Sequence, residues 1–299
     1  MNEFLQQLIN GLAWGSIYAL IALGYTMVYG VLRLINFAHG DVYMIGAMTG
    51  YYLARAFPNP SGSSFYFMII LALSMLACAL LGAFIERIAY RPLRKAPRLS
   101  ILITAIGVSL LLEYGGQMLF GADPKFFPEL IVNRPLFQWH GITINNIQCM
   151  IIGVSVALML LLQFIVMKTK IGKAMRAVSF SHTASQFVGI PLNQVITITF
   201  LIGSALAGAA GIMVSLANPK IEPLMGIMPG LKAFVAAVLG GIGNIPGALV
   251  GGYLMGVAET FVTAYLSSTY RDALAFVLLI LILLIKPAGL LGKAVKEKV

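Results

Sequence analysis

The sequence predicts an all-α membrane protein that crosses the bilayer about nine times. Of its 299 residues, 60% are hydrophobic and only 10% are charged, and the mean hydropathy is +0.92. A chain this apolar does not resemble a soluble domain. Its apolar residues fall in runs of about 20, the length that an α-helix needs to cross a hydrocarbon core of about 30 Å. We therefore expect one integral membrane domain over residues 1–299.

Nine apolar runs are candidate spans, and eight to ten crossings are compatible with them. They cover residues 8–31, 36–54, 66–86, 100–120, 149–167, 195–217, 228–243, 246–266 and 272–286. No basic segment precedes the first run and no small-residue cleavage site follows it, so we expect a retained span rather than a removable signal peptide. The seventh and ninth runs are short, and the glycine-rich region 226–256 is compatible with re-entrant or broken helices.

The basic residues divide the loops into two sets. If successive loops alternate between the two sides, 14 Lys and Arg residues fall on one side and 5 on the other, with Lys232 inside a span. Cytoplasmic loops carry the excess of Lys and Arg, so this split predicts an outer N-terminus and an inner C-terminus. The same rule accounts for the formal net charge of +10. A basic stripe interleaved with aromatic residues is absent from the sequence, and we therefore expect no nucleic-acid partner.

Three further patterns concern loops and helix packing. The 28-residue segment 121–148 is the largest outer loop, and we expect it to lie on the membrane surface or form a small outer subdomain. Residues 240–247 predict a tight inner turn. Small residues recur at four-residue spacing and predict close helix packing in lipid. They are Gly11, Gly15 and Ala19; Gly203, Ala207 and Gly211; Gly243, Gly247 and Gly251; and Gly252 with Gly256.

The longest water-compatible segment between two spans is the inner loop 168–194. Its first part carries Lys168, Lys170, Lys173 and Arg176. A short helix from about Ser181 to Val188 should follow, because Ser181 is a good N-cap, Gly189 suits a left-handed C-cap and Pro191 cannot continue the helix.

A helix this short needs tertiary support. Its residues Ala184, Phe187 and Val188 offer an apolar face. That face could enter a groove on a partner protein, or the helix could lie on lipid headgroups with its basic flanks.

The sequence holds no set of residues typical of an enzyme. Neither Gly172-Lys173 nor Gly292-Lys293 belongs to a phosphate-binding loop, because Ala follows each lysine. The histidines are scattered at positions 39, 140 and 182, and Cys78 and Cys149 lack metal-type spacing. We expect no catalytic activity, no cofactor and no bound metal.

A few polar residues in or beside the spans could line or gate a path across the membrane. Glu113, Lys232 and Glu259 are lone ionisable residues on separate helices, where they could equally join helices together. Asn36, His39 and Asp41 could hydrogen-bond to each other and fix a sharp re-entry of the chain. A proton-driven or sodium-driven carrier usually needs a chain of such groups, so their small number argues against one.

At this point the motifs resemble a known family. RLINFAHG from Arg33, ITITFLIGSALAGAAG from Ile196, KAFVAAVLGGIGNIPGALVGG from Lys232 and the terminal KPAGLLGK resemble the LivH-type permeases of branched-chain amino-acid ABC importers. The resemblance implies a subunit of the bacterial inner membrane that works by alternating access. It also implies a second homologous permease, two cytoplasmic ATPase subunits that use the ATP, and a periplasmic amino-acid-binding protein. The same resemblance would also cover a permease for urea, an amide or a related solute.

The inner loop is similar to the segment of ABC permeases that docks on the ATPase. Thr183 stands where the motif has Glu, and Ser185 replaces its second Ala. This departure removes any salt bridge from that position but leaves docking by shape and apolar contact. The resemblance assigns the coupling role to Arg176, Ser181, His182, Thr183, Ala184, Ser185, Phe187, Gly189 and Ile190.

Overall fold

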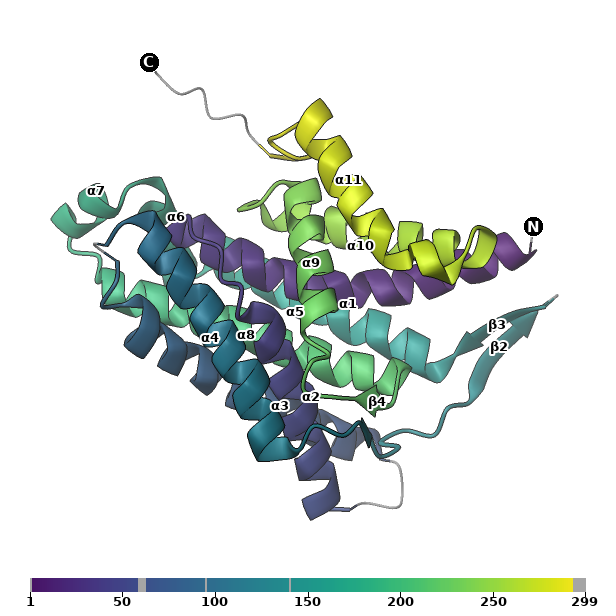
Figure 1. The fold of residues 1–299 in the computed structure, drawn as a ribbon. Coiled ribbons are helices and arrows are strands. Elements are labelled where there is room, and N and C mark those ends of the chain that lie inside the picture. The colour runs from purple at the N-terminus through teal and green to yellow at the C-terminus, as the bar shows by residue number, and fades with distance from the viewer. Residues whose placement is uncertain (1, 59–62, 95, 140, 293–299) are drawn as a thin grey trace.

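The computed structural model describes residues 2–58, 63–94, 96–139 and 141–292, and its helices pack into one bundle (Figure 1). The first four long helices are α1 (Asn2–Leu32), α2 (His39–Ala56), α3 (Ser64–Ile85) and α4 (Arg98–Phe120). The next three are α5 (Asn146–Lys168), α6 (Lys170–Phe180) and α7 (His182–Phe187). The last are α8 (Leu192–Ala217), α9 (Ile227–Gly240), α10 (Ile245–Tyr265) and α11 (Arg271–Ile285). A π-helical turn, Glu86–Tyr90, extends α3, and a 3₁₀ turn, Ser268–Tyr270, precedes α11.

Each of the nine predicted spans corresponds to a helix. Within the described residues, seven helices are long and apolar enough to cross a membrane. The other two are α2, which carries the polar residues His39, Asp41 and Arg55, and α9, which is only 14 residues long. In the glycine-rich region, the seventh run forms the short helix α9, while the eighth forms α10, which is long enough to span the membrane. Predictions that involve Lys95, His140, Lys293, Lys296 and Lys298 lie outside the described residues.

α1 lies at the centre of the bundle. Every residue from Gly15 to Val28 is buried, so this helix is surrounded by other helices and not by lipid. α10 comes closest to it, because a side chain added at Gly256 would lie 2.2 Å from the Gly15 nitrogen. Gly252 is equally close to Ala19. The predicted packing role of this glycine spacing is confirmed, since backbones can approach this closely only where one partner lacks a side chain.

α2 and α9 begin inside the bundle. Gly40 at the start of α2 lies against Gly226 and Gly230 at the start of α9, and His39 lies against Gly24 in α1. The chain turns back into the bundle after α1 through Arg33, which has a left-handed φ of 54°. The sequence predicted this re-entry.

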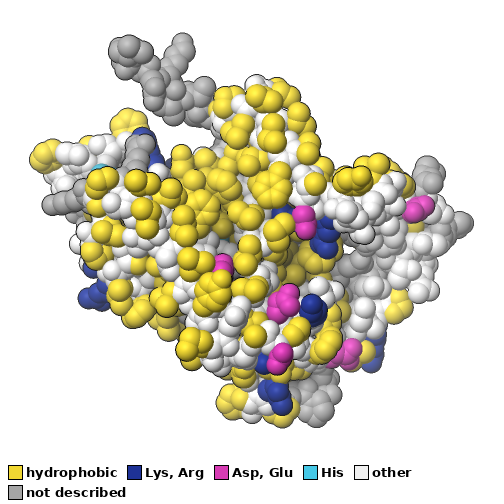
Figure 2. All heavy atoms as spheres, viewed as in Figure 1, with side chains coloured by type: hydrophobic (Ala, Val, Ile, Leu, Met, Phe, Trp, Pro, Cys, Tyr) yellow, Lys and Arg dark blue, Asp and Glu magenta, His cyan; other side chains and the backbone are white. Residues whose placement is uncertain are grey.

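The outer surface of the peripheral helices is apolar. Leu80 on α3, Leu111 on α4, Phe164 on α5 and Leu284 on α11 are all more than half exposed. Figure 2 shows hydrophobic side chains over most of the visible face, with acidic and basic side chains gathered in a few places. This distribution fits helices that face lipid on one side and other helices on the other.

The loops gather at two opposite ends of the bundle. At one end, α7 contacts the end of α1, and the 241–244 turn packs against residues 289–292. At the other end lie the β2–β3 hairpin (Pro135–Trp139 and Ile142–Asn145) and the short pair of β1 (Lys125–Phe126) with β4 (Lys220–Ile221). Figure 1 shows α7 and the hairpin far apart. The alternation of loops predicted from sequence is therefore confirmed, and segment 121–148 forms a small subdomain of strands at its end.

Candidate functional site

The inner loop 168–194 folds into two short helices at the end of the bundle. α6 was not predicted from the sequence. Its buried residues Gly172, Met175 and Val178 recur at three-residue spacing, and the Thr169 side chain caps it by accepting a hydrogen bond from the Gly172 N–H at 3.1 Å. That spacing and that cap are the sequence signals that could have revealed it. Arg176 is exposed and donates a hydrogen bond to the Met167 carbonyl on α5 at 3.4 Å.

α7 has the boundaries that its sequence predicted. The Ser181 hydroxyl accepts a hydrogen bond from the Ala184 N–H at 3.2 Å, and Gly189 ends the helix with a left-handed φ of 78°. Ser185 is buried, whereas Thr183 and Ala184 are exposed. Both caps are therefore confirmed.

Two large apolar side chains at the C-terminal end of α7 are exposed. Phe187 is 87% exposed and Val188 is 74% exposed. Figure 1 shows the helix at the edge of the bundle. Two large apolar side chains exposed on a segment outside the spans are typical of a surface that contacts a partner protein or the membrane surface.

α7 is tied back to the bundle at both ends. A ring nitrogen of His182 lies 2.9 Å from the Val31 carbonyl near the end of α1. After Gly189, the Ile190 N–H donates to the Ser185 carbonyl at 3.0 Å, and the chain enters α8 through Pro191. A displacement of α7 would therefore act on α1 and α8.

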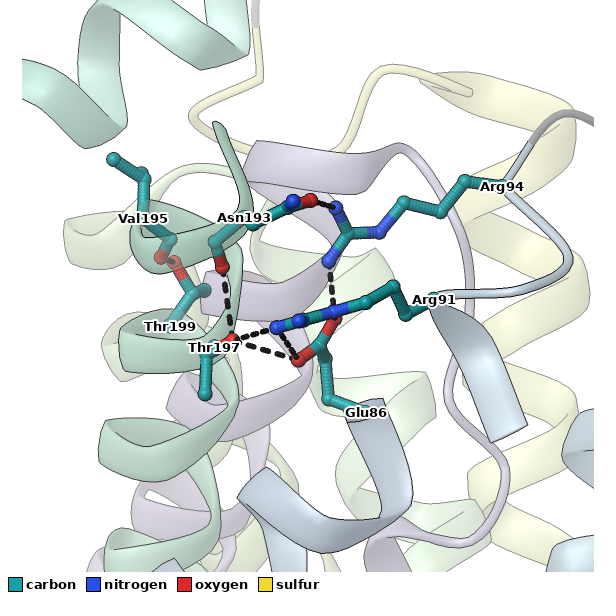
Figure 3. A network of polar contacts seen from close by, with 7 residues as sticks. All are labelled: Glu86, Arg91, Arg94, Asn193, Val195, Thr197 and Thr199. Atoms are coloured by element: carbon teal, nitrogen blue, oxygen red, sulfur yellow. Dashed lines mark hydrogen bonds and ion pairs between the residues drawn. The ribbon is translucent and has the colours of Figure 1, made fainter. Parts of the chain in front are cut away.

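A buried carboxylate fixes the start of α8, as Figure 3 shows. Glu86 is fully buried on the π-helical turn after α3. Its carboxylate accepts hydrogen bonds from Thr197 at 2.7 Å, from Arg91 at 3.2 Å and from Arg94. Arg91 also donates to Thr197 at 2.9 Å, and Arg94 donates to Asn193 at 2.7 Å. We call these five residues the Glu86 network.

The Glu86 network joins the end of α3 to the first two turns of α8. Two guanidinium groups surround one carboxylate, so the network carries a net positive charge. Burial lowers the pKa of the Arg94 guanidinium, and the opposing charge of Glu86 limits this effect. Glu86 has no role predicted from the sequence, because Arg91 and Arg94 beside it serve there only as determinants of topology. One sequence signal could have revealed this role: an acidic residue at the end of a span with Arg five and eight residues after it.

The predicted cluster of Asn36, His39 and Asp41 is not one hydrogen-bonded group. The Asn36 side chain accepts from the Tyr90 hydroxyl at 2.7 Å, while Asp41 accepts from Ser109 on α4. Ser109 lies 3.4 Å from Glu113, so it links the two carboxylates. His39 is buried against Tyr25, with 4.8 Å between the ring centroids. The expectation of mutual side-chain hydrogen bonds is wrong. Asn36 precedes α2 and its side chain bonds to Tyr90, while His39 and Asp41 are two positions apart on α2 and therefore point in different directions.

Lys232 and Glu259 are not lone residues, which corrects the interpretation from sequence. The Lys232 ammonium lies 3.1 Å from the Glu259 carboxylate, and both side chains are buried. Glu259 also accepts from Tyr18 at 2.8 Å and from Arg271, while Lys232 lies 2.7 Å from Asp272. Two cations and two anions from α9, α10 and α11 therefore neutralise one another, as charges in low dielectric must. We call this group the Glu259 network.

A cavity of about 400 Å³ adjoins the Glu259 network at the end of the bundle that carries the hairpin. Glu259 and Arg271 line it together with residues of α1, α5, α8 and segment 121–148. The other predicted path residues, Asn36, His39, Asp41, Glu113 and Lys232, do not line it. Across the described ranges, no group of His, Cys, Asp and Glu side chains is arranged to hold a metal ion.

Comparisons with known proteins agree with the motifs. A profile of the family described as "Branched-chain amino acid transport system / permease component" matches residues 7–283. The chain is 42% identical over 302 residues to the high-affinity branched-chain amino acid permease BraD of Pseudomonas aeruginosa, covering 99% of this chain and 98% of BraD.

Two permeases named LivH are similar over the same extent. The identity is 41% to the Salmonella typhimurium protein and 40% to the Escherichia coli protein, in each case over 99% of this chain and 98% of the relative. No solved structure shows a significant match. With a profile match over most of its length, a helical membrane fold and full-length similarity to three such proteins, this chain belongs to the permease family of branched-chain amino acid transport systems.

Proposed function

We propose that this chain is the membrane-spanning subunit of an ATP-driven importer that carries branched-chain amino acids across the bacterial inner membrane. The observation that carries the proposal is the full-length similarity to BraD and LivH, which are named as permease proteins of high-affinity branched-chain amino acid transport systems. The subunit itself hydrolyses no ATP in this proposal. Two cytoplasmic ATPase subunits supply the hydrolysis, a second homologous permease completes the membrane part, and a periplasmic binding protein delivers the amino acid.

α7 is the contact with the ATPase in this proposal. Its exposed Phe187 and Val188 are suited to an apolar groove, and the helix needs such support because isolated helices of this length are unstable in water. The neighbouring residues from Arg176 to Ile190 shape and cap the segment. The end of the bundle that carries α7 therefore faces the cytoplasm, which agrees with the excess of Lys and Arg in its loops. The N-terminus then lies in the periplasm.

The contacts behind α7 suggest how its motion reaches the spans. His182 touches the end of α1, and the Glu86 network holds the start of α8 against α3. Because α1 and α8 are the most buried of the seven candidate spans, they cannot deform locally without moving their neighbours. A push on α7 would thus turn into a movement of the bundle core, which alternating access requires.

Transport by reconstituted vesicles tests the proposal. Vesicles that contain the complete importer should take up leucine only with ATP and binding protein. Phe187→Asp should lower leucine uptake at least tenfold, because a charge cannot enter an apolar groove. The matched control Phe57→Asp changes a phenylalanine that is also exposed but lies at the other end of the bundle, and it should leave uptake unchanged.

Three outcomes would contradict the proposal. Uptake by this chain alone and without ATP would favour an ion-coupled carrier. Uptake of urea or an amide in preference to leucine would favour another solute class. Full uptake by the Phe187→Asp importer would place the ATPase contact elsewhere.

A further inference from the structure

The cavity beside the Glu259 network has the chemical features of a binding site for a small zwitterion. It measures about 400 Å³, within the usual range for small-ligand sites. Five helices and segment 121–148 meet around it, so its walls come from distant parts of the chain.

Arg271 supplies one wall with a fixed positive charge. Its Nε donates to Glu259, and its guanidinium carbon lies 5.3 Å from the centre of the Trp14 ring. These two contacts fix the plane of the group. A guanidinium has five N–H donors, so most of them stay available beyond the bond to Glu259, even with the Tyr18 oxygen near. A fixed guanidinium edge is suited to bind a carboxylate through two parallel hydrogen bonds.

The end of α8 supplies the opposite partial charge. Leu216 and Ala217, its last two residues, line the cavity. The last carbonyls of a helix have no partner within the helix, and this end of the helix dipole is negative. The amide side chains of Gln7 and Asn133 are also on the wall and can accept hydrogen bonds. The carbonyl oxygens at the end of α8 are therefore suited to bind an ammonium group, and the amide oxygens are further acceptors on the wall.

The remaining lining is part apolar and part polar. Trp14 and Ile17 on α1, Ile151 on α5 and Ala264 on α10 supply an apolar wall, and Asn10, Asn145, Gln148, Thr260 and Thr263 also line the cavity. A carboxylate site, an ammonium site and an apolar wall around one cavity are the three elements that recognise an amino acid with an aliphatic side chain.

We propose that this cavity binds an aliphatic α-amino acid, with Arg271 holding the carboxylate, the end of α8 holding the ammonium group, and the wall around Ile151 holding the side chain. The inference rests on the proposed function and assigns a place to its substrate. It also gives the Glu259 network a role, because Lys232, Tyr18 and Glu259 together hold Arg271 in position.

Binding to the full chain in lipid nanodiscs tests the site. Equilibrium dialysis should compare leucine with leucinamide, which lacks the carboxylate, and with 4-methylpentanoate, which lacks the ammonium group. We expect the unmodified protein to bind leucine at least tenfold more tightly than either analogue. Arg271→Gln should weaken leucine binding at least tenfold and bring the leucine to leucinamide ratio close to one. The control Arg55→Gln removes an arginine that also stacks on an aromatic ring, that of Tyr51, but lies off the cavity, and it should preserve the ratio.

A second variant tests the cavity without disturbing the ion pairs of the Glu259 network. Ala264→Phe should fill the cavity and abolish leucine binding without changing any charge, whereas Ala273→Phe, on the exposed surface of α11, should bind leucine normally. Normal leucine binding by Ala264→Phe, or an unchanged ratio in Arg271→Gln, would overturn the inference. If the complete importer with Arg271→Gln still takes up leucine with an unchanged KM, the site is wrong and the proposed function stands. If the unmodified importer takes up no leucine, the proposed function fails.

Discussion

Glu86 illustrates how a single buried carboxylate can organise a loop. It is fully buried, yet three side chains from two segments donate to it. Hydrogen bonds to a charged group are each stronger than neutral ones, and a buried charge without them would be unstable. The residue therefore acts through its charge as well as its shape.

Replacing Glu86 by Gln should reveal that charge. The amide keeps the shape of the side chain, but it leaves Arg91 and Arg94 facing a neutral group. We expect a loss of about 2 kcal/mol of stability, measured by thermal unfolding in detergent. Glu222→Gln is the control, since Glu222 forms an exposed pair with Lys220 and should contribute less than about 1 kcal/mol. Equal effects of the two changes would contradict the role of Glu86.

At the scale of elements, glycine determines how closely α1 and α10 approach. Gly256→Ala would place a methyl group 2.3 Å from the Gly15 Cα, a contact that only separation of the two helices can relieve. We expect a loss of about 1–3 kcal/mol in unfolding measurements. Gly153→Ala on α5 is the matched control, because nothing lies within 4 Å of the added methyl group. Its higher helix propensity should raise stability by up to about 1 kcal/mol. A destabilised Gly153→Ala protein would show that helix packing is not the cause.

The two helices of the inner loop differ in how visible they are in the sequence. α7 was predictable because its caps are local: Ser181 and Gly189 act within the segment itself. α6 packs Met175 and Val178 against helices that are distant in the sequence, and basic residues hide that pattern. Local sequence signals are thus enough to place the ends of a helix. Its buried face, in contrast, can be identified only when the helices that pack against it are known.

At the scale of the whole molecule, the loops lie at two opposite ends of the bundle. We therefore expect a reagent that cannot cross the membrane to label cysteines at one end only. In a Cys149→Ser background, where the remaining Cys78 is buried, a membrane-impermeant maleimide should label Gln138→Cys in intact cells. Gln186→Cys should react only after the membrane is opened. Both positions are exposed in the chain itself, so in cells that express it without the ATPase subunits, which would cover α7, the two positions differ only in which side of the membrane they face. The reverse pattern would invert the proposed orientation.

The sequence by itself determined the fold class, the positions of nine helices, the alternation of loops, the α7 caps and the family. These features depend on local composition and short-range spacing, which are visible in one segment at a time. Only the tertiary structure decided which charges meet. Lys232 and Glu259 appeared isolated, and Glu86 had no role, because their partners lie on other helices.

The position of α1 at the centre of the bundle was also visible only in the tertiary structure. An apolar helix gives the same pattern whether lipid or other helices surround it, since both are apolar environments. The position of α1 is visible only in the burial of every residue from Gly15 to Val28. The cavity beside Arg271 is likewise a product of tertiary structure, because its walls belong to five helices and one loop that no local pattern relates to one another.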